Sequence, residues 1–495
     1  MLRQLTTILA LGVMAAAAFA QPAQSTQDAK PDPLKNLVQA ISDPARAGQT
    51  LSALRATGDK DLAPLLVALS TSGNKDWRLS AMRALAEIVG KDAAEPIAQR
   101  LKSDPSMLIR SEALIALIAL KACTKERLQE AINSPDESVQ CIAARTAVQE
   151  GYADIALDTL KKLTASRDAD TVALARMSLL KAGQKDQFEP LKALAADPKP
   201  SAEALTLLME QIIEEKIEAG LEIARIVAKS DQPWELRLRA WRAVSAISPA
   251  ADALREAIVA SGQTVFRVQM LRVLAAREDS AAQVEALSSG DDSVAVLARM
   301  EKLRKAGGAE AAKAVSEAVK LGHPVVLDYV LDRAREDFAA RGKDADFYTA
   351  GLLAIIQSVE ADATSLKAEH VRAAKAATLL ADMGTPAAFD GLKKVLAGRY
   401  GAPVRVAATG LLRTKNKAAC DLVRPLLKSP YSELASDAAI LLGRFADGDA
   451  TEYLTSVVSH PDKHSELLVA MANWYLLKIA GRTREAGEAL AREVK

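Results

Sequence analysis

Residues 103–117 read SDPSMLIRSEALIAL, a polar turn that leads into an amphipathic helical pattern. The apolar residues Ile109, Ala113 and Leu117 are spaced four apart, which places them on one face of a helix. The serine, aspartate and proline before them are typical of a helix start, where a side chain caps free N–H groups and proline is tolerated. The stretch therefore predicts a helix that begins near Ile109 and buries one side.

The same pattern recurs along the chain with a nearly constant spacing, interrupted by one gap that is more than twice as long. The first apolar residue of each copy, called the anchor below, is Trp77, Ile109, Val139, Thr171, Ala204, Leu236, Phe266, Val294, Val371, Val404 and Leu434. Each interval also holds a second pattern of helical period. A period held this closely predicts a tandem array of two-helix units rather than one compact core.

Prolines and glycines recur at fixed places relative to the anchors. Pro64, Pro96 and Pro190 each precede an anchor by almost the same distance, near the start of the first helical pattern. This predicts a kink or a late first turn in the first helix of the unit. Gly90, Gly151 and Gly183 each follow an anchor at the end of the second helical pattern, where a left-handed residue commonly ends a helix.

An arginine follows the anchor in six of the eleven copies, at Arg78, Arg110, Arg237, Arg267, Arg372 and Arg405. A two-helix unit whose second helix opens with an aliphatic-arginine pair resembles the HEAT-like repeat family, over roughly residues 50–305 and 371–460. The resemblance implies an all-α fold, a right-handed α-solenoid of tandem helix-turn-helix repeats. It also implies that these arginines join neighbouring repeats by reaching acidic groups or carbonyls in an adjoining turn.

The two ends of the chain differ from the array. Residues 1–20 predict an export signal, with Arg3 before an apolar stretch and small residues Ala18 and Ala20 before a cleavage point at Gln21. An uncleaved membrane anchor is the alternative, but the apolar stretch is short for a spanning helix. We expect a periplasmic or secreted protein that is not inserted in a membrane after cleavage.

The predicted organisation follows from these features. It comprises a signal peptide (1–20), a polar linker (21–35), N-terminal HEAT-like repeats (36–305), an irregular segment (306–370), and C-terminal repeats with a helical cap (371–495). The irregular segment has two interpretations, either one degenerate repeat with a longer loop or a hinge or docking insert.

Composition and motifs point away from several classes of function. The formal net charge is +1 without a basic block, so no nucleic-acid partner is expected. His460 and His464 are four residues apart but lie in a predicted turn, and nothing nearby completes a metal site. The three cysteines are expected to be small apolar residues. No phosphate loop or nucleophile elbow occurs, so the sequence predicts no cofactor, no metal and no enzyme activity.

One row of residues is a candidate binding site. Position +6 from the anchor lies opposite the apolar face of the second helix and carries Arg83, Arg145, Arg242 and Arg272. The alternative is that these are solvated charges, for example Arg83 with Glu87 four residues on. Because guanidinium groups pair well with carboxylates, the favoured partner is an acidic protein or peptide.

The leading functional prediction is therefore an exported, non-catalytic scaffold that presents a concave helical groove to a protein or peptide. An accessory subunit of an exported enzyme is the second hypothesis. A HEAT-like enzyme of the lyase type is the third.

Overall fold

The computed structural model describes residues 31–197, 201–360 and 367–494, so the predicted signal peptide and most of the predicted linker lie outside the described residues. Within the described residues the regular structure is helical and contains no strand, which confirms the all-α prediction. The chain divides into two compact units. Unit 2 is Leu66–Lys302, and unit 1 combines the described residues up to Leu65 with those from Leu303 onward.

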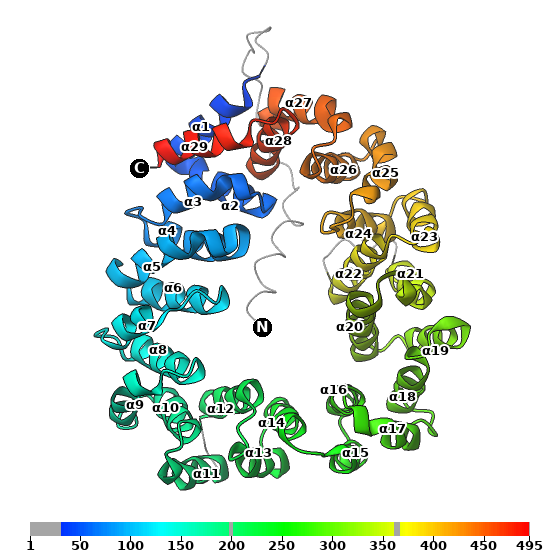
Figure 1. Cartoon of the computed structure of the whole chain (residues 1–495). Coiled ribbons are helices and arrows are strands. Elements are labelled where there is room, and N and C mark those ends of the chain that lie inside the picture. The colour runs from blue at the N-terminus through cyan, green and yellow to red at the C-terminus, as the bar shows by residue number, and fades with distance from the viewer. Residues whose placement is uncertain (1–30, 198–200, 361–366, 495) are drawn as a thin grey trace. The chain divides into compact units, whose positions relative to one another are not determined.

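Unit 2 is a stack of helix hairpins arranged in two layers, with α3 (Ala63–Leu69) and α18 (Ser293–Arg304) containing its two boundaries (Figure 1). The first helices are α5 (Ala94–Ser103), α7 (Lys125–Ile132), α9 (Leu157–Leu163), α11 (Phe188–Ala196), α13 (Gly220–Lys229), α15 (Ala251–Ala260) and α17 (Ala281–Leu287). The second helices are α4 (Lys75–Ala84), α6 (Met107–Ala119), α8 (Glu137–Gln149), α10 (Ala169–Lys181), α12 (Ala202–Glu215), α14 (Trp234–Ile247) and α16 (Thr264–Ala275). Each of these second helices packs against the next. These hairpins are HEAT-like repeats.

The anchors mark the same position in every one of these second helices. Each is the third residue of its helix, from Trp77 in α4 to Phe266 in α16. Pro64, Pro96 and Pro190 stand at the second or third residue of α3, α5 and α11, so the late first turn is confirmed and no kink is needed. The glycines after the second helices have positive φ, as predicted: Gly90 (74°), Gly151 (84°) and Gly183 (88°).

The arginine that follows the anchor connects consecutive repeats. Arg78 donates to Asp104, with Nε and Oδ2 2.9 Å apart, and also to two carbonyls of its own preceding turn. Arg110 donates to the carbonyl oxygen of Asp104 (2.7 Å) and forms an ion pair with Asp136, the residue before α8. Arg237 instead lies over the ring of a neighbouring phenylalanine, 5.2 Å from its centroid. The structural role that the family resemblance implied is confirmed for Arg78 and Arg110.

Unit 1 has the same hairpin architecture. Its N-terminal part contains α1 (Pro33–Ser42), α2 (Pro44–Thr57) and the 3-10 turn η3 (Lys60–Leu62). Its C-terminal part contains α19 (Gly308–Lys320), α20 (Pro324–Arg341), η9 (Gly342–Tyr348), α21 (Thr349–Gln357), α22 (Ala368–Met383), α23 (Pro386–Leu396), α24 (Ala402–Leu411), α25 (Cys420–Val423), η11 (Arg424–Lys428), α26 (Ser432–Arg444), α27 (Thr451–Ser459), α28 (Glu466–Ile479) and α29 (Thr483–Glu493).

The segment 306–370 contains one complete hairpin, α19 with α20, and the first helix of the next, α21, whose partner is α22. Its helix α20 has 18 residues and buries two charged side chains, Arg333 and Asp337. Asp337 pairs with Arg304 at 2.6 Å and accepts a hydrogen bond from the hydroxyl of Tyr348 at 2.9 Å. Extra length in this segment therefore lies in a long helix and the η9 turn.

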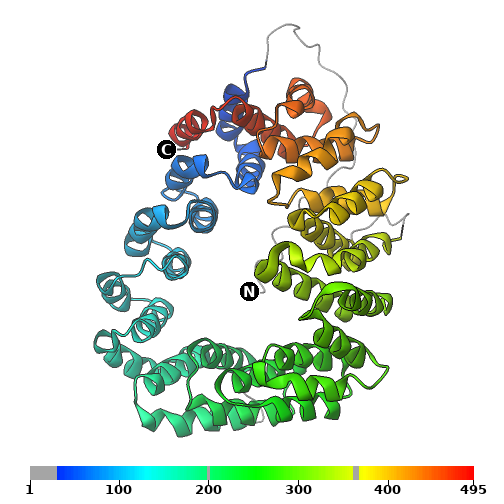
Figure 2. The same ribbon diagram turned by 45° about the vertical axis from the view of Figure 1, so that its right-hand side comes forward.

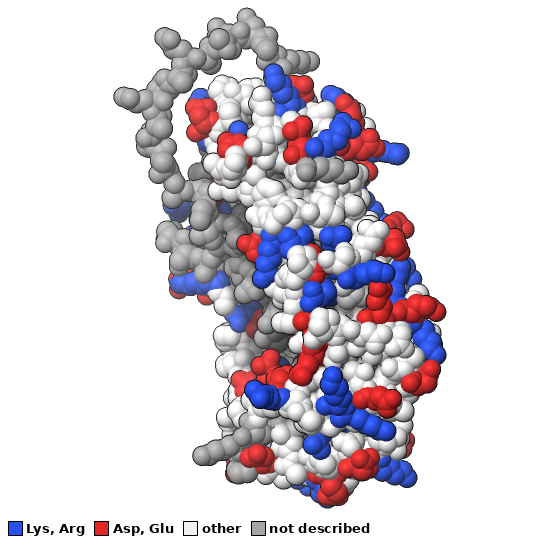
Figure 3. Space-filling view, turned by 90° about the vertical axis from the view of Figure 1, so that its left-hand side faces the viewer, with Lys and Arg blue, Asp and Glu red and all other residues white. Residues whose placement is uncertain are grey.

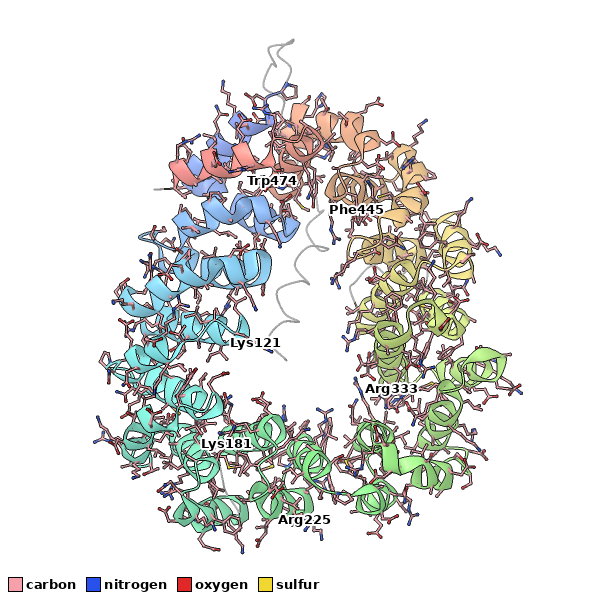
Figure 4. All side chains as sticks on the ribbon, in the orientation of Figure 1. Lys121, Lys181, Arg225, Arg333, Phe445 and Trp474 are labelled. Atoms are coloured by element: carbon pink, nitrogen blue, oxygen red, sulfur yellow. The ribbon has the colours of Figure 1, made fainter. Side chains whose placement is uncertain are left out.

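The two ends of the described chain pack against each other in unit 1. Helix α28 contacts α1 and α2, and α29 contacts α1 and η3. Trp474 of α28 is fully buried, and its indole N–H donates to Asp59 (3.3 Å), which also pairs with Lys478 (2.7 Å) (Figure 4). Gly487 of α29 lies so close to the carbonyl of Asp61 that no Cβ would fit between them. The C-terminal cap is thus helical, and it covers the N-terminal helices instead of ending the stack in solvent.

Candidate functional site

The second helices of unit 2 expose one continuous face. In each helix the anchor, +4, +7 and +8 positions point into the stack, while positions −1, +3, +6 and +10 are mostly exposed or half-buried. These four positions of α4 to α16 are called the second-helix face below. The apolar +2 residues Leu238 and Val268 are buried and are not part of it.

An ion pair shows that this face is concave. Arg145 of α8 and Glu214 of α12 approach to 3.5 Å, although α10 lies between their helices. Packed helices are about 8–10 Å apart, so side chains two helices apart can meet only where the layer bends towards them. Met177, at +6 of the intervening α10, is fully buried. In Figures 1 and 2 the second helices of unit 2 lie on the inner side of its bend.

All four arginines predicted from the sequence lie on this face, in α4, α8, α14 and α16, but Arg83 and Arg145 already have acidic partners. Arg83 donates two hydrogen bonds to Glu112 of α6, at 2.7 and 3.2 Å, and this contact raises the pKa of its guanidinium. Arg145 has Glu214. The charge of both is compensated within the protein, and Arg83 combines the contact with Glu112 between repeats with the attraction of Glu87 on its own side.

Helix α12 supplies the partner of Arg145 and further carboxylates that pair with basic residues of unit 2. Besides Glu214, it carries Glu215, which forms a 2.8 Å ion pair with Lys181 of α10 and accepts a hydrogen bond from Gln149 of α8 (Figure 4). A further acidic residue of α12, Glu210, is 3.7 Å from Arg239 of α14. The carboxylates of α12 thus pair with Arg145 of α8 and Lys181 of α10, and at a longer distance with Arg239 of α14.

A basic cluster lies on α14 and α16, formed by Arg239, Arg242 and Arg272. Arg242 is exposed, yet the pKa of its guanidinium is lowered, first because surrounding protein reduces its hydration and then because Arg272 and Arg239 are nearby. An accessible group with reduced hydration is what a concave surface produces. Among the described carboxylates, none forms an ion pair with Arg242.

Sequence reasoning identified Arg242 and Arg272 and missed Arg239. That residue occupies position +3, which lies less than one helical turn from +6 and therefore on the same exposed side. A search over the whole exposed arc rather than one position would have found it. The residues at +6 in the other second helices of this face are Ile115, Met177 and Glu210, so the basic cluster is local to α14 and α16.

Figure 3 shows the side of unit 2 that is formed by the first helices of its N-terminal repeats, such as α5 and α7. Acidic and basic side chains are mixed over it (Figure 3). Exposed charges of both signs are typical of a solvated surface. The second-helix face also carries both signs, and its basic cluster is a local feature of α14 and α16.

In unit 1, two features of the described residues could serve a binding site, namely a carboxyl group with a raised pKa and a cavity. Burial raises the pKa of Asp437 in α26 to about 7, and Thr409 donates to it at 3.3 Å. A cavity of about 520 Å³ opens between α19, η9, α21 and α23, beside Phe347 and Gly391. In the described part of the chain no three His, Cys, Asp or Glu side chains gather closely enough to hold a metal. Helices long and apolar enough to cross a membrane are also absent from it.

Comparison with known proteins gives structural similarities only. No protein-family model and no curated protein matches the chain. A structure of UNC-45 from Drosophila melanogaster shares 14% identity with a TM-score of 0.25, covering 93% of this chain and 80% of that one. The karyopherin Kap121p shares 11% identity with a TM-score of 0.32, covering 87% of this chain and 52% of that one. A second structure of Kap121p, bound to the extreme C-terminus of the protein phosphatase Cdc14p, shares 13% identity with a TM-score of 0.33.

This chain thus spans about half the length of Kap121p. TM-scores this low establish nothing about its function, and the repeat assignment rests on the hairpins themselves.

Proposed function

We propose that the chain is an exported, non-catalytic scaffold whose second-helix face in unit 2 binds an acidic protein or peptide segment. The observation that supports this proposal is the cluster of Arg239, Arg242 and Arg272 on a concave surface, where Arg242 lies close to two like charges and has reduced hydration. Arg242 lies beside two like charges, and among the described carboxylates none forms an ion pair with it, which costs free energy in the unbound protein. Carboxylates of a partner relieve that cost when they bind.

The geometry favours carboxylates as the ligand groups. A guanidinium group presents its N–H donors in a planar fork that matches the two oxygens of a carboxylate. The reduced hydration of Arg242 strengthens such a contact, because electrostatic attraction grows as water is excluded. Side chains from two adjacent helices, α14 and α16, can then hold successive acidic residues of one segment.

Fluorescence anisotropy with a labelled peptide of eight glutamates tests the proposal. Arg242→Glu/Arg272→Glu should weaken binding at least tenfold, whereas Arg83→Glu/Arg145→Glu should weaken it much less, because Arg83 and Arg145 lie in α4 and α8, outside the basic cluster. Raising the salt concentration should weaken wild-type binding. Arg225→Glu, on the exposed side of first helix α13, is the matched control (Figure 4).

Two results would contradict the proposal. One is unchanged affinity in Arg242→Glu/Arg272→Glu protein that keeps its helical circular dichroism. The other is equal binding of an eight-lysine peptide to the wild-type protein.

The export part of the proposal rests on residues 1–20. Protein purified from its native host should begin at Gln21 when its N-terminus is sequenced. An intact Met1 in the soluble cytoplasmic fraction would remove the basis for a periplasmic or secreted location.

A further inference from the structure

Exposed aliphatic side chains are concentrated on one helix of the second-helix face. Three of the seven large hydrophobic side chains exposed in the described residues belong to α6, namely Met107 (51% exposed), Leu108 (45%) and Ile115 (49%). Leu108 and Ile115 are two helical turns apart and occupy positions −1 and +6, so they lie along the same exposed side. Clustered exposed apolar groups mark interaction surfaces more often than scattered ones.

The apolar surface continues across the next three second helices. Position +3 is held by Ile142 in α8, Leu174 in α10 and Leu207 in α12, and all three are half-buried. In α14 the same position is Arg239, the first member of the basic cluster. Equivalent positions of stacked repeats form rows, so the +3 row is aliphatic from α8 to α12 and basic at α14.

Two charges beside the aliphatic part are already paired inside the protein, and Asp170 at position −1 of α10 accepts a hydrogen bond from Ser201. Glu112 is held by Arg83, and Arg145 is held by Glu214. A partner on this part therefore meets aliphatic groups flanked by two ion pairs and by the hydrogen-bonded carboxylate of Asp170. It meets the basic cluster only at the far end, on α14 and α16.

From these observations we infer that the second-helix face of unit 2 binds a two-part segment, with aliphatic residues on α6 to α10 and carboxylates at Arg239, Arg242 and Arg272. The inference rests on the proposed function and specifies its partner. From α6 to α14 there are four helix-to-helix steps of about 8–10 Å, or roughly 35 Å. An extended chain advances about 3.3 Å per residue, so the segment needs about ten residues or slightly more.

Three labelled synthetic peptides test this inference. The first carries Leu-Ile-Leu, a six-residue Gly/Ser spacer and four glutamates; the second has serines in place of the aliphatic residues; the third has a spacer of one residue. The first peptide should bind at least tenfold more tightly than the other two. Leu108→Asp/Ile115→Asp should abolish this advantage and leave the affinity for the second peptide unchanged.

Matched variants separate a local effect from misfolding. Val259→Asp alters another exposed aliphatic residue (61% exposed) on first helix α15 and should change none of the three affinities. Leu108→Ser/Ile115→Ser removes the same apolar groups without adding charge and should have the same effect as the aspartates. Both double variants change exposed positions, and circular dichroism checks their fold.

The outcomes distinguish the inference from the proposed function. If the first two peptides bind equally well, or if the Leu108 and Ile115 variants keep the advantage of the first, the two-part segment is wrong while the acidic scaffold stands. If no peptide binds, both fail. If the short-spacer peptide binds as tightly as the first, the two parts of the surface do not act together, and the inference is overturned.

Discussion

The two units of this protein are built from the same hairpin but are held together differently. Unit 2 is continuous in sequence, and each second helix packs against its neighbour one repeat away. In unit 1 the first two helices of the described chain pack against the last two, through contacts such as the one between Trp474 and Asp59, 415 residues apart. Contacts between successive repeats stabilise unit 2. In unit 1, a single set of contacts between residues distant in sequence joins its N-terminal and C-terminal parts.

This difference has a consequence for stability. In a repeat array each repeat interacts mainly with its neighbours, so the loss of one contact destabilises only the adjacent repeats. The contacts between α28, α29 and the N-terminal helices form a single set that joins residues distant in sequence. Damage there should release both ends of the chain together.

The largest expected effect is that of Trp474→Ala. The indole is fully buried and donates to Asp59, so its removal should cost about 3–5 kcal/mol of unfolding free energy in unit 1. Hydrogen exchange followed by mass spectrometry should show lost protection in α1, α2, α28 and α29, with α6 to α16 unchanged.

Trp77→Ala is the matched control for this prediction. Trp77 is a half-buried anchor in unit 2, so its truncation should give a smaller loss, confined to helices near α4. Equal loss of protection in both units after Trp474→Ala would show that the protein unfolds as one cooperative body and that the comparison of the two units is wrong.

The sequence predicted the locally determined features well. Anchors, first-turn prolines and terminal glycines depend on contacts within one repeat or between two adjacent ones, and such contacts recur at a constant spacing. The arginine between repeats was predicted for the same reason, through the family resemblance. These features lie in both units, since both use the same hairpin.

Three features could not be predicted in this way. Helix α20 was unrecognised because buried Arg333 and Asp337 replace apolar residues on its inner side, and a polar residue at a core position breaks the pattern used to find helices. The packing of Trp474 against the N-terminal helices could not be predicted, because it occurs once and does not recur with the spacing of the repeats. At the candidate site, the partners of Arg83 and Arg145 come from other helices, so the sequence could not show that these two arginines are already paired.

A smaller effect tests how evenly unit 2 is stabilised. Arg110→Ala removes the ion pair with Asp136 and the hydrogen bond to the Asp104 carbonyl, and should cost about 1–3 kcal/mol. Arg237 occupies the equivalent place, but among the described residues its guanidinium lies over Phe266 instead of forming an ion pair. A cation–π contact of this kind contributes about 0.5–1 kcal/mol, so Arg237→Ala should cost less than Arg110→Ala.

Urea unfolding of both variants, with hydrogen exchange to locate the change, measures this difference. Arg110→Lys keeps the charge but loses the planar fork, and should recover only part of the stability lost in Arg110→Ala. If Arg237→Ala proves as costly as Arg110→Ala, the stabilisation comes from packing of the arginine stem rather than from its polar contacts. The aliphatic parts of these arginines would then act as part of the apolar core. The similar stability of successive repeats in unit 2 would come from the packing of equivalent residues rather than from ion pairs.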